Sequence, residues 1–509
     1  MRITTWLVCA VLCLCARYAY SHVGSPDVYA EGQAGPYHLS VVVRPPLVIP
    51  GVADIEVQAR GSEVDRITMT PIPLTGEAAK YPPVPDAMER PSKDGEFYTG
   101  HLWIMATGSW QIRFAVSGAA GQGILSIPLP AAAMATRRME SGMGAMLAGL
   151  GLLLVLGLVG IIGAATREAK LAPGTTATRA NRRNSYVAMG VALSFLIAGV
   201  ILGNVWWKSE AESYSKNVYK PLEMTAEVAQ GNRMILKLRD PGWLQQRKLD
   251  DFVLDHNHLM HLYMIRWPEM DTVFHLHPEP VTTGEFQLTL PLIPAGTYRL
   301  YADVVHAMGF PETVVGTISL PSIAGRPLSG DDAEGTAPPV RYGEPNLWQT
   351  AGNSAVSNAG EEQRFHLGDV YTMRWSKPTY LQARVPIDFH FELVDPYGNP
   401  PRDMSLYMGM AGHAAFVKTD GSVFAHVHPN GTVAMAALMM ANPQPPMTGN
   451  DNGAGASMNS MPGMELGASA PPAFVDFPYG FPSIGSYRIF VQMKHGGVVE
   501  TGVFDVTVR

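Results

Sequence analysis

Cysteine is almost absent from this chain of 509 residues, which has only three, Cys9, Cys13 and Cys15. All three lie within residues 1–21, where a positive start, an apolar run and small residues before the expected cleavage point are typical of a secretory signal peptide. We expect the mature chain to begin at His22 and to contain neither a thiol nor a disulfide. Its domains must then be held together by ordinary hydrophobic cores, although they face an oxidising compartment.

Charge is also sparse. Charged residues make up 16% of the chain, the formal net charge is −7, and no block of basic residues is present. Proteins that bind nucleic acid usually carry a basic patch, so we expect no nucleic-acid partner. The sequence also has no nucleophile elbow, phosphate-binding loop or helix-borne zinc protease motif. We therefore predict that the chain is not an enzyme.

Two stretches lack charged residues altogether. Residues 142–165 and 184–207 are each long enough to cross a bilayer core of about 30 Å as a helix, and Gly199 and Gly203 would permit close helix contact. Residues 166–183 contain five basic residues and one acid, so the positive-inside rule places this loop in the cytoplasm. We predict a two-helix transmembrane hairpin that anchors N- and C-terminal domains on the extracytoplasmic (periplasmic or extracellular) side of the cell membrane.

The rest of the chain has short segments of period-two alternation separated by proline and glycine, which is typical of β-sandwich domains. Its length suggests roughly three or four domains. We predict a β-sandwich domain at 22–130, a histidine β-sandwich domain at 212–321, a linker at 325–362, and a second histidine β-sandwich domain at 363–509 with an insertion at 442–472.

Four histidines recur in the same order in the last two domains. A His-x-His-Pro run lies inside each set, and the last histidine comes eight residues after the tyrosine of a Gly-x-Tyr-Arg signal. Internal repetition of this kind defines the structural unit. The two sets are His261, His275, His277 and His306 in the first domain, and His413, His426, His428 and His495 in the second. A related Gly-x-Trp at Trp110 suggests a third, degenerate copy that has lost the last histidine.

The strand pattern separates candidate ligands from candidate core residues. Side chains alternate between the faces of a strand, so His275 and His277 share one face while Phe274 and Leu276 point the other way, toward a core. Three or four imidazoles without a thiol suit Cu(II), Zn(II) or Ni(II), and the methionines nearby in the sequence would shift the preference toward Cu(I). A His-x-His pair alone is a weak signal, but recurrence of the whole set favours a metal site. The alternative is that the histidines are satisfied core groups and the methionines fill gaps.

Other residues give weaker signals. His22 could chelate copper through its amine and imidazole, and the run Asp255-His256-Asn257-His258 could supplement a site. Asp303 and Glu312, near His306 in the sequence, could support a ligand from a second layer or act as an acid or base, although a lone carboxylate near a histidine is usually structural. The Gly-x-Tyr at Tyr298 resembles the tyrosine corner of sandwich domains, so we expect this tyrosine to be structural.

Three segments of the first histidine domain, Met260 to Tyr263, Phe274 to Pro278 and Gly296 to Leu300, together resemble YtkA-like domains. These are exported immunoglobulin-like β-sandwich modules commonly associated with copper homeostasis. The resemblance covers each histidine domain and, faintly, residues 22–130. It implies a mainly β fold, with immunoglobulin-like β-sandwich domains flanking the transmembrane hairpin, and a connection to copper. The insertion after Pro429 departs from a compact module.

The leading hypothesis is a membrane-anchored extracytoplasmic protein that binds copper, or alternatively zinc, for sequestration, delivery or sensing, with a metal-transfer protein as a possible partner. Its expected ligands are the eight histidines of the two sets. The sequence leaves open whether the two domains bind separate ions or share one. The alternative is a non-catalytic scaffold that recruits a partner through sandwiches whose histidines are structural. A copper oxidase ranks last, because the sequence shows no substrate pocket.

Overall fold

The computed structural model describes residues 26–91, 96–137, 139–340, 362–368, 370–443 and 471–509. The fold is mainly β, with several antiparallel sheets and two long apolar helices. Two compact units are formed, one by residues 1–131 together with 220–509 and the other by residues 132–219. The predicted signal peptide and His22 lie outside the described residues.

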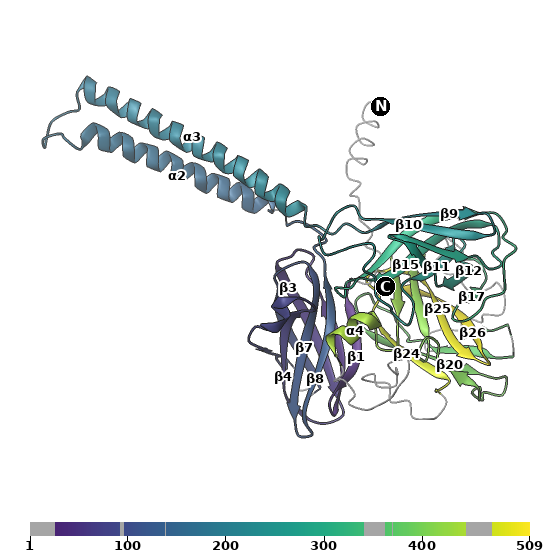
Figure 1. The fold of residues 1–509 in the computed structure, drawn as a ribbon. Helices are drawn as coiled ribbons and strands as arrows, with labels where there is room; N and C mark the ends of the chain where they lie inside the picture. The colour runs from purple at the N-terminus through teal and green to yellow at the C-terminus, as the bar shows by residue number, and fades with distance from the viewer. Residues whose placement is uncertain (1–25, 92–95, 138, 341–361, 369, 444–470) are drawn as a thin grey trace, which may run out of the picture. The chain divides into compact units, whose positions relative to one another are not determined.

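The unit 132–219 contains two helices that lie side by side (Figure 1), α2 (Ser141–Glu168) and α3 (Arg179–Ser215). Both are long and apolar enough to cross a membrane. Ser185 Oγ donates a hydrogen bond of 2.7 Å to the Gly163 carbonyl, and a Cβ at Gly163 would lie 2.6 Å from Met189 Sδ. Gly163 is therefore the close-contact glycine. The prediction for Gly199 and Gly203 differs from the structure, because a Cβ at either would meet nothing within 4 Å.

In the other unit, the described residues between 26 and 131 form two four-stranded antiparallel sheets, ordered β1-β2-β3-β6 and β5-β4-β7-β8. The predicted alternating segments are found here as strands. The elements are β1 (Val28–Ala34), β2 (Tyr37–Arg44), β3 (Gly51–Arg60), β4 (Val64–Pro73), the short helix η1 (Glu77–Lys80), β5 (Asp86–Ala87), β6 (Phe97–Ile104), β7 (Gly108–Gly118) and β8 (Gly121–Ala131).

The first histidine domain has two sheets, ordered β13-β14-β10-β9 and β16-β15-β11-β12-β17. They enclose a core that includes Leu236, Leu262, Phe274, Phe286 and Leu300. The strands are β9 (Glu223–Ala229), β10 (Arg233–Arg239), β11 (His261–Arg266), β12 (Thr272–Leu276), β13 (Glu279–Thr282), β14 (Glu285–Thr289), β15 (Gly296–Val305), β16 (Pro311–Leu320) and β17 (Ala333–Thr336).

The second histidine domain repeats this plan, with sheets β18-β19-β20-β24 and β21-β25-β22-β23, and with β26 paired to β25. Its core includes Trp375, Phe389, Phe416 and Ile489, and also Tyr29 from β1. The elements are β18 (Glu362–His366), β19 (Thr372–Ser376), β20 (Ile387–Val394), β21 (Met404–Ser405), β22 (His413–Lys418), β23 (Phe424–Val427), α4 (Met435–Ala441), β24 (Phe474–Tyr479), β25 (Gly485–His495) and β26 (Val498–Val508). Most of the predicted insertion at 442–472 lies outside the described residues.

The predicted linker at 325–362 is not simply a connection. Its strand β17 pairs with β12, where Ala333 is the register partner of His275. A Cβ on Gly335 would lie 2.6 Å from Thr501 Cγ2 of β26, so the linker also packs closely on the second histidine domain. Residues 341–361 of this segment lie outside the described part of the chain.

The two five-stranded sheets that carry the histidines contact each other across a third apolar cluster. Tyr263, Val273 and Tyr301 come from the first domain, and Val417 and Phe424 from the second. The Tyr301 and Phe424 rings are stacked, with centroids 4.2 Å apart. Each sheet thus has one face on its own domain core and the other on this interface. As the predicted alternation requires, Phe274 lies on the core face and His275 on the interface face.

Candidate metal centre

Eight histidines gather between the two histidine domains, and we call them the histidine cluster. Six belong to the predicted sets, and all are partly or fully buried. The members are His256, His258, His261, His275 and His277 from the first domain, and His413, His426 and His428 from the second. Period-two alternation explains the gathering: on each strand the histidines lie on the interface face, opposite to residues such as Leu262 and Phe416 that fill the domain cores.

One group of three contains residues of both domains. One ring nitrogen from each of His256, His413 and His428 lies within 4.8 Å of the others. The ring centroids are 5.0 Å (His256 to His413), 4.9 Å (His256 to His428) and 5.0 Å (His413 to His428) apart. The three rings therefore form a nearly equilateral triangle, which suits three ligands of one ion.

The other group of three comes from the first domain alone. Ring nitrogens of His261, His275 and His277 also lie within 4.8 Å of one another, and His261 Nδ1 is 3.2 Å from His275 Nε2. With metal–nitrogen distances of about 2.0 Å, two imidazole ligands of a tetrahedral ion have their nitrogens roughly 3.3 Å apart. The pair already has this spacing. Because His261 Nε2 and His275 Nδ1 each face an oxygen acceptor, the two nitrogens that face each other carry the lone pairs of the neutral rings, as two ligands of one ion would.

His426 lies between the two groups. Its ring is 5.4 Å from His413 and 4.5 Å from His428, and it is also 5.6 Å from His261 and 5.5 Å from His275. His258 stands at the edge, stacked on His277 with centroids 3.8 Å apart.

In several of these rings, one nitrogen has a hydrogen-bond partner outside the cluster. Such outer partners fix the orientation of a metal-binding imidazole and its tautomer. The contacts are His256 Nδ1 to the Met408 carbonyl (2.9 Å), His261 Nε2 to the Asp255 carbonyl (3.0 Å), His275 Nδ1 to Gln492 Oε1 (2.9 Å), His277 Nδ1 to Asp332 Oδ1 (3.0 Å) and His426 Nδ1 to Asp303 Oδ2 (3.2 Å). Asp303, which the sequence places near His306, contacts His426 of the second domain.

Several inward nitrogens lack a hydrogen-bond partner among the described residues. Among them are Nε2 of His256, His277 and His426, and both ring nitrogens of His413. A buried polar atom without a partner costs about 1–3 kcal/mol. A bound cation would take the lone pair of one nitrogen on each of these rings and would so remove part of this cost.

Burial also affects the protonation of four rings of the cluster. It lowers the pKa of the His261, His275, His413 and His428 imidazoles well below the ordinary value, and neighbouring imidazoles act in the same direction. The neutral ring is the form that binds metal ions. These four rings are therefore ready to act as ligands at neutral pH without losing a proton.

His256 and His258 were only supplementary candidates in the sequence, and the structure places both in the cluster. They lie in a tight turn in which Asp255 and His258 exchange backbone hydrogen bonds of 2.8 and 2.9 Å. His256 and Asn257 both have positive φ, at 50° and 70°. The second repeat has a similar turn closed by Tyr407 and Met410.

The spacing of these turns from the next histidine is a sequence signal that His256 and His258 belong to the repeat. His256 precedes His261 by five residues, as Met408 precedes His413, and His258 and Met410 occupy the next matching places. The second repeat thus has methionine where the first has histidine. The sequence signal for His256 is therefore this alignment, which pairs it with Met408, another side chain that can bind metal.

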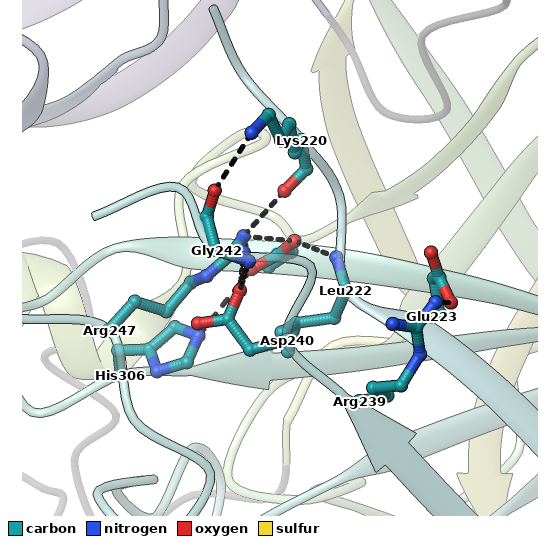
Figure 2. Close-up of polar contacts among 9 residues, drawn as sticks. Lys220, Leu222, Glu223, Arg239, Asp240, Gly242, Arg247 and His306 are labelled. Atoms are coloured by element: carbon teal, nitrogen blue, oxygen red, sulfur yellow. Dashed lines mark hydrogen bonds and ion pairs between the residues drawn. The ribbon is translucent and has the colours of Figure 1, made fainter. Parts of the chain in front are cut away.

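His306 does not join the cluster. Its Nδ1 lies 2.8 Å from Asp251 Oδ1 and its Nε2 3.5 Å from Glu312 Oε2, and Glu312 also pairs with Arg247. Figure 2 shows His306 beside this network, in which Arg247 also contacts Asp240 and the Lys220 carbonyl. Glu312, predicted as a supporting group for ligands, belongs to this ion network instead.

His495 also lies apart, 3.7 Å from Asp403 and against the Tyr371 ring. His306 and His495 both lie outside the cluster because each follows its tyrosine, Tyr298 or Tyr487, by an even number of residues and so shares its face of the strand. Tyr298 and Tyr487 lie in the domain cores, so the face that each shares with the last histidine is the one opposite to the cluster. Each tyrosine hydroxyl donates to a carbonyl four residues upstream, Pro294 or Ser483, at 2.8 Å, in agreement with the structural role predicted for Tyr298.

Comparison with known proteins gives little functional information. A family described as a domain of unknown function (DUF8832) matches residues 366–509. No curated protein matches the chain. Among solved structures, a bacterial ice-binding adhesin is 6% identical, with 94% of this chain and 98% of that one covered and a TM-score of 0.14. Salmonella alpha-2-macroglobulin reacted with methylamine is 8% identical with a TM-score of 0.20; 94% of this chain is covered, but it spans only 24% of the macroglobulin. Similarity at this level does not establish a shared fold.

Proposed function

We propose that the protein binds copper, or alternatively zinc, in the histidine cluster, and that it sequesters, delivers or senses the ion outside the cytoplasm. The observation that carries this proposal is the triangle formed by His256, His413 and His428. Three buried imidazoles point nitrogens at one another, and His256 and His413 have inward nitrogens without a hydrogen-bond partner among the described residues. In a domain interface held only by packing, such nitrogens would be a net cost.

The choice of copper or zinc follows from the ligands. All are imidazoles, which suit zinc and copper, and no carboxylate oxygen belongs to either group of three within the described residues. The burial of the cluster favours tight holding of an ion over rapid exchange, so sequestration or directed transfer to a partner protein is the best-supported role.

The proposal includes an arrangement in the cell. Each pair of sheets would be an immunoglobulin-like β-sandwich, and α2 and α3 would form a transmembrane hairpin. The basic loop at 166–183 supports a cytoplasmic position for the connection between the helices, which puts the histidine domains outside.

The test is metal content. We expect the full chain, purified in detergent, stripped with a chelator and then equilibrated with micromolar Cu(II) or Zn(II), to retain metal after gel filtration. Replacement of both His275 and His277 by alanine should lower the retained amount, whereas His101→Ala, which changes an exposed histidine, should not. Retention of no metal by the parent chain would contradict the proposal.

A scaffold with structural histidines gives a different result. In that case His426→Ala and His428→Ala would lower the unfolding temperature equally with and without metal. If the cluster binds metal, the ion should raise the unfolding temperature of the parent chain and raise that of these variants by less.

A further inference from the structure

We propose that the histidine cluster holds two ions in separate but adjacent sites, one bound by His256, His413 and His428 and the other by His261, His275 and His277. This inference rests on the proposed function and deepens it. The sequence leaves open whether the two domains bind separate ions or share one. We infer two separate ions, but there is not one site in each domain, because the site of His256, His413 and His428 needs residues of both domains.

Ring spacing supports two ions over one. Within the two triangles the centroid separations run from 4.8 to 5.4 Å. Between them, His256 to His261 is 6.0 Å and His275 to His413 is 6.4 Å. No histidine belongs to both triangles, so each can close around its own ion without taking a ligand from the other.

His426 connects the two sites. Its ring contacts two members of each triangle, and its Nε2 has no hydrogen-bond partner among the described residues. The Asp303 carboxylate holds its other nitrogen. A seventh imidazole in this position can complete the coordination of either ion, and its place between the sites requires the ions to be close.

Two adjacent cations repel each other, and neutral imidazoles do not offset this. Carboxylates around the cluster do. Asp303 and Asp332 hydrogen-bond His426 and His277, and Asp331 lies 3.4 Å from His258 Nε2. Hydrogen bonding from a carboxylate to the outer nitrogen of an imidazole also makes the ring a stronger ligand.

The two sites are not equivalent. His413 and His428 match His261 and His277 in the repeat, but the third member differs. The first site takes His256 from the turn of the other domain, where the second repeat has Met408, and the second site takes His275 from its own domain. A single substitution can therefore be directed at each site.

The experiment measures copper per chain in the detergent-purified full chain after equilibration with excess Cu(II) and gel filtration, by mass spectrometry of the metal. The variants are His256→Asn, His277→Asn and the double variant, with His101→Ala as control. Asparagine is chosen because it tolerates the positive φ of residue 256. We expect each single variant to hold one copper fewer than the parent and the double variant two fewer. Copper bound elsewhere on the chain remains in the double variant, so it drops out when the copper content of the double variant is subtracted from that of the parent.

The outcomes are distinguishable. If parent and double variant hold equal copper, the proposed function fails as well. If the difference is one, and either single substitution removes it, the cluster binds one ion and only the two-ion inference is overturned. Electron paramagnetic resonance of the parent gives a second readout that does not depend on any variant folding. Two close Cu(II) ions give a broadened, coupled signal, and a loaded parent with the signal of isolated Cu(II) alone would contradict the inference.

Discussion

The Glu312 side chain is completely buried, and two basic side chains face it, Arg247 and His306. Glu312 also accepts a hydrogen bond of 2.7 Å from the Leu222 amide, which ties the first residues of the histidine domain to this network. Loss of one partner from a buried charged group is costly because the remaining charge loses its compensation. This network gives the His306 imidazole two carboxylate partners, Asp251 and Glu312.

We therefore expect His306→Ala to lower the free energy of unfolding by about 1–3 kcal/mol and to leave the amount of bound copper unchanged. Chemical denaturation and metal analysis of the same preparation measure both quantities. His101→Ala is the matched control, because His101 pairs with Asp54 at the surface, where an ion pair contributes about 0–1 kcal/mol. Loss of copper without loss of stability would show that His306 is a ligand after all.

Six of the eight predicted histidines reached the cluster because alternation along a strand is a local rule. His275 and His277, or His426 and His428, must share a face whatever the domains do. Order in the repeat predicts His306 and His495 as ligands, but their even spacing from a core tyrosine places them on the opposite face of the strand. The position of His256 depends on a turn with two positive φ values and on the docking of two domains, and neither follows from the alternation of a single strand.

At the scale of elements, β17 shows how a segment of loop-like composition can become part of the site. Asp331 and Asp332 lie just before it and contact His258 and His277, and the Asp331 carbonyl accepts a hydrogen bond from Tyr407. The segment pairs with β12 on one side and packs on Thr501 of β26 on the other. Its sequence, rich in glycine, proline and alanine, gives no sign of this, because the strand is specified by its neighbours.

Gly335 is the most sensitive point of this strand. A Cβ there would lie 2.6 Å from Thr501 Cγ2 and 3.2 Å from Val273 Cγ1. We expect Gly335→Val to force the linker away from the second histidine domain, to lower the unfolding temperature and to weaken copper retention, although residue 335 is not a ligand. Gly368→Val is the control, since a Cβ there meets nothing within 4 Å. Equal copper affinity in both variants, measured by competition with a chelator, would show that the linker does not position the cluster.

At the scale of the whole molecule, the cluster depends on domains that are far apart in the sequence. Gln492 holds His275 across 217 residues, and Asp303 holds His426 across 123. The Asp255 carboxylate accepts a hydrogen bond of 2.7 Å from the Ala436 amide in α4, which fixes the turn that carries His256 to the second domain. A fragment with only one histidine domain would therefore lack at least one of the two triangles.

The orientation in the membrane can be tested through the scarcity of cysteine. If residues 1–21 are removed on export, the mature chain has no thiol, and a single introduced cysteine reports its own exposure. Thr283 and Thr176 are both exposed, the first in a turn of the first histidine domain and the second in the loop between α2 and α3. We expect a membrane-impermeant maleimide to label Thr283→Cys in intact spheroplasts of an expression host and to label Thr176→Cys only after permeabilisation.

The parent chain should remain unlabelled in both conditions, because any label on it would mean that the leader cysteines are retained. Labelling of Thr176→Cys before permeabilisation, with Thr283→Cys protected, would place the histidine domains in the cytoplasm and remove the extracytoplasmic role from the proposal while leaving the metal chemistry intact.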